Sequence, residues 1–260
     1  MPANNYSEDL KLLIDAAQEA GRIATRFTNA DPEVWDKPDG AGPVTEADLA
    51  VNRMLEAELQ AARPDYGWLS EETPPNSERL EKERVFIIDP IDGTRSFIEG
   101  SSTWAHSLAI AENGKVVAGV VFLPLRDKMY VAASGLGARL NDELISPSNK
   151  NSLNDAEVLA ARPAMEAKHW ITLPRIKRSH RPSLAYRLSL VAQGRFDAML
   201  TLRRTWEWDI AAGAIILEEA GVTATDKTGG ALVFNNEDPR VAGTVAANRA
   251  LHSEIISALR

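Results

Sequence analysis

Residues 89–94 have the sequence DPIDGT and follow a short apolar run. Proline removes a backbone donor and stops a strand ladder, and the turn that follows can bring the carboxylates of Asp89 and Asp92 to the same side. Mg²⁺ prefers hard oxygen ligands such as carboxylates, carbonyls and water. The segment therefore predicts a magnesium site, although Asp, Pro and Gly are also the residues of an ordinary turn.

The end of this segment could bind an anion. Gly93 permits a tight backbone, and the amides of Gly93, Thr94 and the next residues can point at a phosphate if they begin a helix. We therefore expect Gly93 and Thr94 to bind a phosphate group.

Three further acidic residues are candidates for the same site. Glu71 follows a strand-like segment, Asp209 lies at the start of an apolar helical segment, and Asp48 comes three positions after Thr45. Each has an ordinary alternative: a solvated loop acid, a helix N-cap and a capping-box acid. Several carboxylates held together repel one another and have raised pKa values unless cations lie between them. A shared site would therefore require metal ions.

Two amphipathic helices are expected before any strong strand. After Ser7 as the N-cap, apolar residues recur at the spacing of one helical face from Leu10 to Phe27. Thr45 and Asp48 resemble a capping box that opens a second helix.

The middle of the chain is rich in β-favouring segments. The apolar run 85–88 is stopped by Asp89 and Pro90, and strands 104–111 and 115–123 are expected to form a hairpin around residues 112–114. Residues 130–133 continue this meander. We expect residues 1–150 to form an α+β part that carries most of the metal ligands.

Strand and helix signals alternate beyond about residue 150. The expected elements are strands at 157–160, 197–202, 222–225 and 241–246, a helix opening at Pro182 and Ser183, and a helix over 209–220. We expect residues 151–260 to form an α/β part that carries Asp209 and the substrate-facing segment. The two parts are expected to form one compact unit.

The composition argues against several functions. The 260 residues include no cysteine, which excludes disulfides, thiolate zinc sites and a cysteine nucleophile. The net charge of −8 disfavours nucleic acid as the main partner, because that affinity relies on Lys and Arg neutralising phosphates. No signal-peptide pattern and no run of about 18 apolar residues is found. We therefore expect a cytoplasmic protein without a membrane partner.

Four segments together resemble the inositol monophosphatase superfamily. They are residues 42–48 (GPVTEAD), 70–73 (SEET), 89–94 and 208–213 (WDIAAG), in the order and with spacing similar to that of the family. The resemblance implies a layered αβαβα sandwich, usually a homodimer. It also implies phosphatase activity on a small phosphorylated substrate, with two or three Mg²⁺ ions and inhibition by Li⁺.

The resemblance also implies a set of metal ligands. Glu71, Asp89 and the Ile91 carbonyl would hold one metal ion, and Asp89, Asp92 and Asp209 would hold a second. All of these positions match the family pattern.

The same resemblance implies catalytic roles for three residues. Thr94, with Asp48 nearby, would position the water that attacks phosphorus, and Glu71 would assist.

The substrate-facing segment departs from the inositol enzymes. These typically carry a glutamate about seven residues before their Trp-Asp pair, where this chain has residues 200–204 (LTLRR). Arg203 and Arg204 are cations at a suitable distance for a second phosphate, although both could equally be solvated surface residues. The segments Ser183–Arg187 and Glu207–Asp209 are also more similar to the 3′(2′),5′-bisphosphate nucleotidases.

Three interpretations of the function follow. The first is removal of the 3′-phosphate of adenosine 3′,5′-bisphosphate, and the second is an inositol, sugar or histidinol phosphate phosphatase. The third is a regulatory protein that binds RNA or the transcription machinery. The complete set of acids and the net charge of −8 argue against the third as a sole function.

Overall fold

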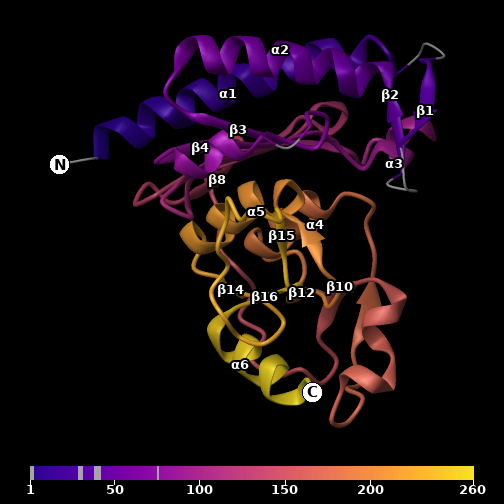
Figure 1. Cartoon of the computed structure of the whole chain (residues 1–260). Coiled ribbons are helices and arrows are strands. Elements are labelled where there is room, and N and C mark those ends of the chain that lie inside the picture. The colour runs from indigo at the N-terminus through magenta and orange to yellow at the C-terminus, as the bar shows by residue number, and fades with distance from the viewer. Residues whose placement is uncertain (1–2, 29–31, 38–41, 75) are drawn as a thin grey trace.

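The computed structural model describes residues 3–28, 32–37, 42–74 and 76–260, and it consists of five stacked layers. Figure 1 shows two helices above a large sheet, two helices beneath that sheet, a smaller sheet, and a last helix on the outer face. The layered αβαβα arrangement expected from the sequence is therefore confirmed.

The outer helical layer consists of α1 (Ala3–Thr25) and α2 (Glu46–Ala62). The α1 side chains of Leu13, Ala17 and Ala20 are fully buried against the sheet, as the apolar spacing predicted. The predicted start at Ser7 was wrong, because the helix already begins at Ala3. Thr45 caps α2 in the predicted capping box with Asp48.

The larger sheet has the strand order β3-β4-β5-β6-β7-β8-β9. Its strands are Gly67–Ser70, Arg84–Asp92, Ala105–Glu112, Lys115–Leu123, Lys128–Ala133, Ala138–Leu140 and Glu143–Leu144. The predicted hairpin is β5 and β6, joined at Asn113 and Gly114, which both have positive φ. The expectation that Asp89 and Pro90 end their strand was wrong, because β4 continues to Asp92.

Short helices connect several of these strands. The 3₁₀ helix η2 (Ser77–Glu81) connects β3 to β4, and α3 (Thr94–Ile98) begins directly after β4. The other 3₁₀ helices are η3 (Pro124–Arg126), η4 (Arg162–Met165) and η5 (Ala167–His169). A two-stranded sheet of β1 (Val34–Asp36) and β2 (Pro43–Thr45) precedes α2 and was not predicted.

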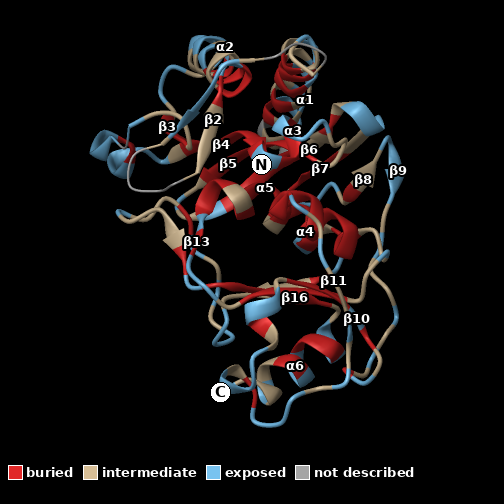
Figure 2. Cartoon of the chain, turned by 90° about the vertical axis from the view of Figure 1, so that its right-hand side faces the viewer, coloured by how far each residue is buried: buried red, intermediate tan, exposed pale blue. Residues whose placement is uncertain are grey.

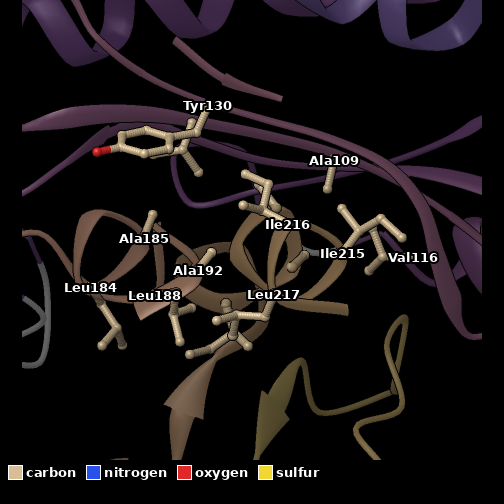
Figure 3. Close-up of a cluster of buried hydrophobic side chains, with 14 of the residues drawn as sticks. Ala109, Val116, Tyr130, Leu184, Ala185, Leu188, Ala192, Ile215, Ile216 and Leu217 are labelled. Atoms are coloured by element: carbon tan, nitrogen blue, oxygen red, sulfur yellow. The ribbon is translucent and has the colours of Figure 1, made fainter. Parts of the chain in front are cut away.

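The middle layer consists of α4 (Leu184–Ala192) and α5 (Glu207–Glu219). Figure 3 shows side chains of both helices, among them Leu188 and Ile216, in one buried cluster beneath the sheet. A Cβ on Gly119 would lie 3.0 Å from the Ala212 backbone, so glycine there lets α5 approach β6 closely. Helix α5 begins at Glu207, two residues before the predicted start at Asp209.

The smaller sheet has the order β11-β10-β12-β16-β14. Its strands are Lys177–Ser179, Glu157–Ala160, Ala198–Thr201, Thr244–Ala247 and Thr223–Thr225. The strand predicted at 241–246 is divided, because β15 (Arg240–Val241) pairs with β13 (Thr205–Trp206) and only β16 joins the sheet.

The last helix, α6 (Arg249–Ala258), covers the smaller sheet and was not predicted. Burial is concentrated in the two sheets and the middle helices, as Figure 2 shows. No helix in the described part of the chain is long and apolar enough to cross a membrane.

Candidate metal and phosphate site

Three aspartates from different parts of the fold meet beside the larger sheet. Asp89 and Asp92 come from β4 and Asp209 from the first turn of α5, and one carboxylate oxygen of each lies within 4.8 Å of the others. The side chains of Asp89 and Asp92 are buried. The structure thus brings together three of the predicted metal ligands.

A bulge in β4 aims both of its aspartates at one side. Asp89 pairs with Ser107 and Asp92 with Ala105, and the register shifts between these pairs. Side chains alternate along a strand, so residues three positions apart would otherwise face opposite sides. Pro90 cannot donate to the ladder and lies inside the bulge.

A buried histidine supports the bulge. The ring of His106, on β5, contacts the Pro90 carbonyl oxygen through Nδ1, and burial lowers the pKa of His106 to about 4. The ring is therefore neutral near pH 7, and Nδ1–H donates to the carbonyl. Local sequence does not indicate this contact, because the position of His106 opposite Pro90 depends on strand register.

The start of α4 holds Asp92 in place. The Oδ2 atom of Asp92 accepts hydrogen bonds from Ser183 Oγ at 2.6 Å and from the Ala185 amide at 2.7 Å. Ser183 is also the N-cap of α4, as predicted. Its contact with Asp92 could not be inferred from local sequence.

The charges of the aspartates are incompletely compensated. Burial raises the pKa of Asp89 well above its usual range, and the charges of Glu71 and Asp92 raise it further. Desolvation and the charge of Asp92 likewise raise the pKa of Asp209. The buried Oδ1 of Asp89 has no hydrogen-bond partner among the described residues.

Hard divalent cations fit this donor set. An unpartnered buried carboxylate oxygen needs a compensating group, and neighbouring carboxylates supply the oxygen ligands that Mg²⁺ prefers. The residues present therefore match the metal predicted from the sequence.

Glu71 lies next to this triad but is paired with a lysine. Its Oε1 is 2.6 Å from Nζ of Lys37, which also contacts Glu72 Oε1 at 2.6 Å. Its backbone amide donates to the Ile88 carbonyl at 3.2 Å, which places Glu71 beside the residue before Asp89. The charge of Glu71 raises the pKa of Asp89. Lys37 was not identified in the sequence, because it approaches Glu71 only through the β1–β2 hairpin.

Thr94 lies within hydrogen-bonding distance of Asp48. Thr94 Oγ1 lies 3.3 Å from Asp48 Oδ1 and 3.3 Å from the Ile91 carbonyl oxygen. Burial raises the pKa of Asp48 to about 6, although hydrogen bonds from Thr45 oppose this shift. The hydroxyl of Thr94 can donate to Asp48 and accept a hydrogen bond from a further group.

Gly93 makes the turn from β4 into α3. Its φ of 101° is disfavoured for residues with a side chain, and it occupies the N-cap position of α3. The amides of Gly93 and Thr94 thus lie at a helix start beside Asp92, as the phosphate-binding prediction requires.

A cavity of about 610 Å³ adjoins the aspartates. Its lining includes Asp92 and Asp209 together with the cationic side chains of Arg187 and Arg203. Arg204 is not part of this lining: its guanidinium pairs with Asp238 at 2.5 Å. The structure therefore brings only one of the two predicted substrate arginines to the cavity.

Arg187 and His180 also line the cavity, as do Lys168 and His169, and none of the four was among the predicted site residues. Arg187 is buried, and its Nη2 lies 2.8 Å from Nε2 of His180. Arg187 follows Ser183 by one helical turn, so that spacing could have indicated it. His180 carried no such signal.

Comparison with known proteins shows which family this chain resembles. A model of the inositol monophosphatase family matches residues 5–260. The inositol-1-monophosphatase of Mesorhizobium japonicum is 32% identical over 257 residues, which cover 93% of this chain and 94% of that protein. The Nus factor SuhB of Xylella fastidiosa is 29% identical over 267 residues, covering 95% and 94%.

Solved structures of proteins from the same family are also similar to this chain. An IMPase from Thermotoga maritima is similar with a TM-score of 0.82 and 30% identity, covering 96% of each chain. The extragenic suppressor protein suhB from Bartonella henselae gives a TM-score of 0.81 and 29% identity, covering 96% of this chain and 97% of its own.

This chain belongs to the inositol monophosphatase family. The family consists of metal-dependent phosphatases, that is, phosphoric monoester hydrolases that act on small phosphorylated substrates.

Proposed function

We propose that this chain is a Mg²⁺-dependent phosphomonoesterase whose metal ions are held by Glu71, Asp89, Asp92, Asp209 and the Ile91 carbonyl. The observation that carries the proposal is the aspartate triad, in which the buried Asp89 Oδ1 has no hydrogen-bond partner among the described residues, at the edge of a cavity whose lining includes Arg187 and Arg203. Two or three Mg²⁺ ions are proposed, with inhibition by Li⁺.

The bound metal ions would neutralise the charge of the phosphate and increase the acidity of water in the site. Thr94 accepts a hydrogen bond from the attacking water while its own hydroxyl donates to Asp48. Glu71, next to the triad, assists in orienting this water. The amides of Gly93 and Thr94 bind the phosphate oxygens.

We propose a substrate with a second phosphate, of the 3′(2′),5′-bisphosphate nucleotide class. The lining of the cavity by Arg203 and Arg187 supports this class, because charge-assisted contacts to phosphate are strong. Arg204 has no part in this proposal, since it pairs with Asp238.

Inositol 1-phosphate, or a sugar or histidinol phosphate, is the alternative substrate. Relatives named inositol-1-monophosphatase favour it. Both substrate proposals can be tested by measuring phosphate release with Mg²⁺ and with EDTA. The panel of substrates to compare consists of adenosine 3′,5′-bisphosphate, adenosine 2′-monophosphate and inositol 1-phosphate. Fastest turnover of inositol 1-phosphate would contradict the nucleotide proposal, and undiminished activity in EDTA would contradict the metal requirement.

A regulatory function is a candidate of another class. Relatives named Nus factor SuhB favour a role with RNA or the transcription machinery. Phosphate release with any substrate of the panel would show that such a role is not the sole function.

We also propose that the protein forms a homodimer. Light scattering on the purified protein tests this proposal.

A further inference from the structure

The carboxylates of the proposed metal site come from two parts of the chain. Asp89 and Asp92 are fixed to the larger sheet, whereas Asp209 lies in the first turn of α5. Helix α5 is apolar on nearly every side, and its neighbours in Figure 3 are apolar side chains. Such contacts are non-directional, so they do not by themselves fix how far the start of the helix lies from the sheet. One direct contact is the hydrogen bond that Ser107 Oγ, on β5, donates to the Trp208 carbonyl at 2.9 Å.

Arg79 extends from the sheet toward a segment near the C-terminus. It lies in η2, directly after the loop that carries Glu71, and its side chain is only 3% exposed. Its Nη1 donates to Asn235 Oδ1 at 2.5 Å, and its Nη2 donates to the carbonyls of Asn236 at 2.8 Å and Glu237 at 3.3 Å. The Arg79 carbonyl in turn accepts from Asn235 Nδ2 at 3.0 Å.

Glu207 holds the same segment from the other side. It is the first residue of α5, two positions before Asp209, and it is fully buried. Its Oε2 accepts from the Asn235 amide at 2.6 Å, and its Oε1 accepts from the Asn236 amide at 2.9 Å and from Asn236 Nδ2 at 2.7 Å. The chain of contacts Arg79, Asn235, Asn236 and Glu207 is called the Arg79–Glu207 bridge below.

The bridge is better suited to setting geometry than to adding stability. Burying two charges carries a large desolvation penalty, and well-packed apolar residues often stabilise a fold equally well. Several directional hydrogen bonds restrict position and orientation, which apolar packing does not. Asn235 also has a φ of 62°, a conformation that Asn tolerates better than most residues.

We propose that the Arg79–Glu207 bridge is a positioning device that fixes Asp209 relative to Asp89 and Asp92 and thereby sets the affinity for Mg²⁺. The inference rests on the proposed metal-dependent function. Arg79 and Glu207 do not line the cavity beside the aspartates, so they act through Asp209 and not on the substrate.

The test measures Mg²⁺ binding to the whole protein by calorimetry, together with the rise in melting temperature on adding Mg²⁺. Arg79→Gln and Glu207→Gln should each weaken Mg²⁺ binding about tenfold, the usual effect of losing a residue that orients a metal ligand. At saturating Mg²⁺, kcat should recover and KM should be unchanged. Arg79→Lys, which keeps the charge, should restore part of the affinity.

Arg84→Lys is the matched control. Arg84 is also an arginine in ion pairs, with Asp9 and Glu112, and is partly buried, but it lies at the opposite end of β4 from Asp89. This variant should lower the melting temperature of the metal-free protein and leave Mg²⁺ affinity within about twofold of wild type. If a bridge variant does not fold, Asn236→Ser, which removes one side-chain donor to Glu207, should still weaken Mg²⁺ binding measurably.

Three results would overturn the inference. Wild-type Mg²⁺ affinity in the bridge variants would show that apolar packing and the Ser107–Trp208 hydrogen bond position Asp209 without the bridge. Equal weakening by Arg84→Lys would show a general effect of lost stability. A wild-type protein that binds no Mg²⁺ would instead overturn the proposed function, and the bridge inference with it.

Discussion

The charge of the aspartate triad is concentrated in a small volume. Three carboxylates lie with oxygens within 4.8 Å of one another. Asp92 accepts two hydrogen bonds, whereas the buried Oδ1 of Asp89 has no partner among the described residues. Burial and mutual repulsion raise the pKa values of Asp89 and Asp209. The protein therefore holds these residues together at the expense of its stability without metal.

Asp209→Asn should separate the contribution of this charge to activity from its effect on stability. We expect kcat to fall by about 10²-fold or more, because a proposed metal ligand is weakened. The melting temperature without metal should rise by roughly 2–4 °C, which corresponds to about 1 kcal/mol for a chain of this size. Phosphate release and thermal unfolding in EDTA measure the two effects.

The control is Asp65→Asn, which removes a charge at an exposed position away from the triad. Neither kcat nor the melting temperature without metal should change in Asp65→Asn. Full activity of Asp209→Asn would exclude Asp209 as a metal ligand.

Thr94 should act on turnover and not on metal binding. Removing its hydroxyl in Thr94→Ala takes away the group that connects Asp48 to water, so kcat should fall about 10²-fold. KM and the Mg²⁺ dependence should change little, and Thr94→Ser should keep most of the activity. A collapse of Mg²⁺ affinity in Thr94→Ala would mean that Thr94 has a structural role.

Arg203 and Arg204 form a natural pair of test and control. Arg203 lines the cavity, whereas Arg204 pairs with Asp238. One charge-assisted contact to phosphate contributes about 1.5–3 kcal/mol, so Arg203→Ala should reduce kcat/KM for adenosine 3′,5′-bisphosphate roughly ten- to hundredfold. The kcat/KM for monophosphate substrates should not change in Arg203→Ala. Equal losses in Arg204→Ala, or none in Arg203→Ala, would contradict this placement.

At the scale of elements, the site depends on where β4 ends and α3 begins. The bulge after Asp89 directs both aspartates to one side, and the Gly93 turn then reverses the chain into α3. The next residue, Thr94, thereby reaches Asp48 at the start of α2. One irregular strand end thus connects the metal ligands to the residues proposed to orient water.

Gly93→Ala should damage both stability and activity. A side chain at a φ of 101° costs about 1–3 kcal/mol, and relief of that strain would move the Thr94 hydroxyl. Gly135→Ala is the control, because Gly135 has a similar φ of 80° with no atom near an added Cβ and lies in the β7–β8 connection. Chemical denaturation should show comparable losses in both variants. Only Gly93→Ala should lose activity; an active Gly93→Ala would show that the turn is not needed for the site.

At the scale of the whole molecule, polar contacts hold the outer layers where apolar packing ends. Arg84 on β4 pairs with Asp9 of α1 at 3.3 Å and with Glu112 of β5 at 3.1 Å, and Arg63 after α2 pairs with Asp9 at 2.9 Å. Tyr6 donates to Glu112 as well. This cluster joins both outer helices to the sheet, at the opposite end of β4 from the aspartate triad.

The cluster should contribute a pH-dependent part of the stability. Burial alone would raise the pKa of Glu112, but hydrogen bonds from Tyr6 and Arg84 outweigh it and lower the pKa below its usual value. A carboxyl with a lowered folded-state pKa stabilises the fold above its unfolded pKa of about 4.3 and loses this contribution as pH falls through the folded value.

Glu112→Gln should therefore be less stable than wild type near pH 7, and the difference should shrink below about pH 4. Chemical denaturation of both proteins across this range measures it. A difference that stays constant with pH would show that Glu112 stabilises the fold through packing and not through its charge.

Much of the fold and of the proposed site follows from local sequence. The helical face of α1, the capping box of Thr45 and Asp48 and the β5–β6 hairpin depend on residues near one another in the chain, so their spacing predicts them. The acids of the site were recognisable because four segments, among them DPIDGT and WDIAAG, together resemble those of a known family in order and spacing. Carboxylate oxygens are ligands that hard cations such as Mg²⁺ prefer, so a shared site of these acids favours such a metal.

The remaining features depend on contacts between residues far apart in the chain. Local sequence does not set the direction of a loop side chain, so only the tertiary structure decided that Arg203 lines the cavity while Arg204 turns to Asp238. Strand register placed His106 opposite Pro90 and continued β4 past Asp89, where a proline had predicted its end. Each of these outcomes reflects packing and pairing energies summed over several elements, which exceed the local preferences of any one segment.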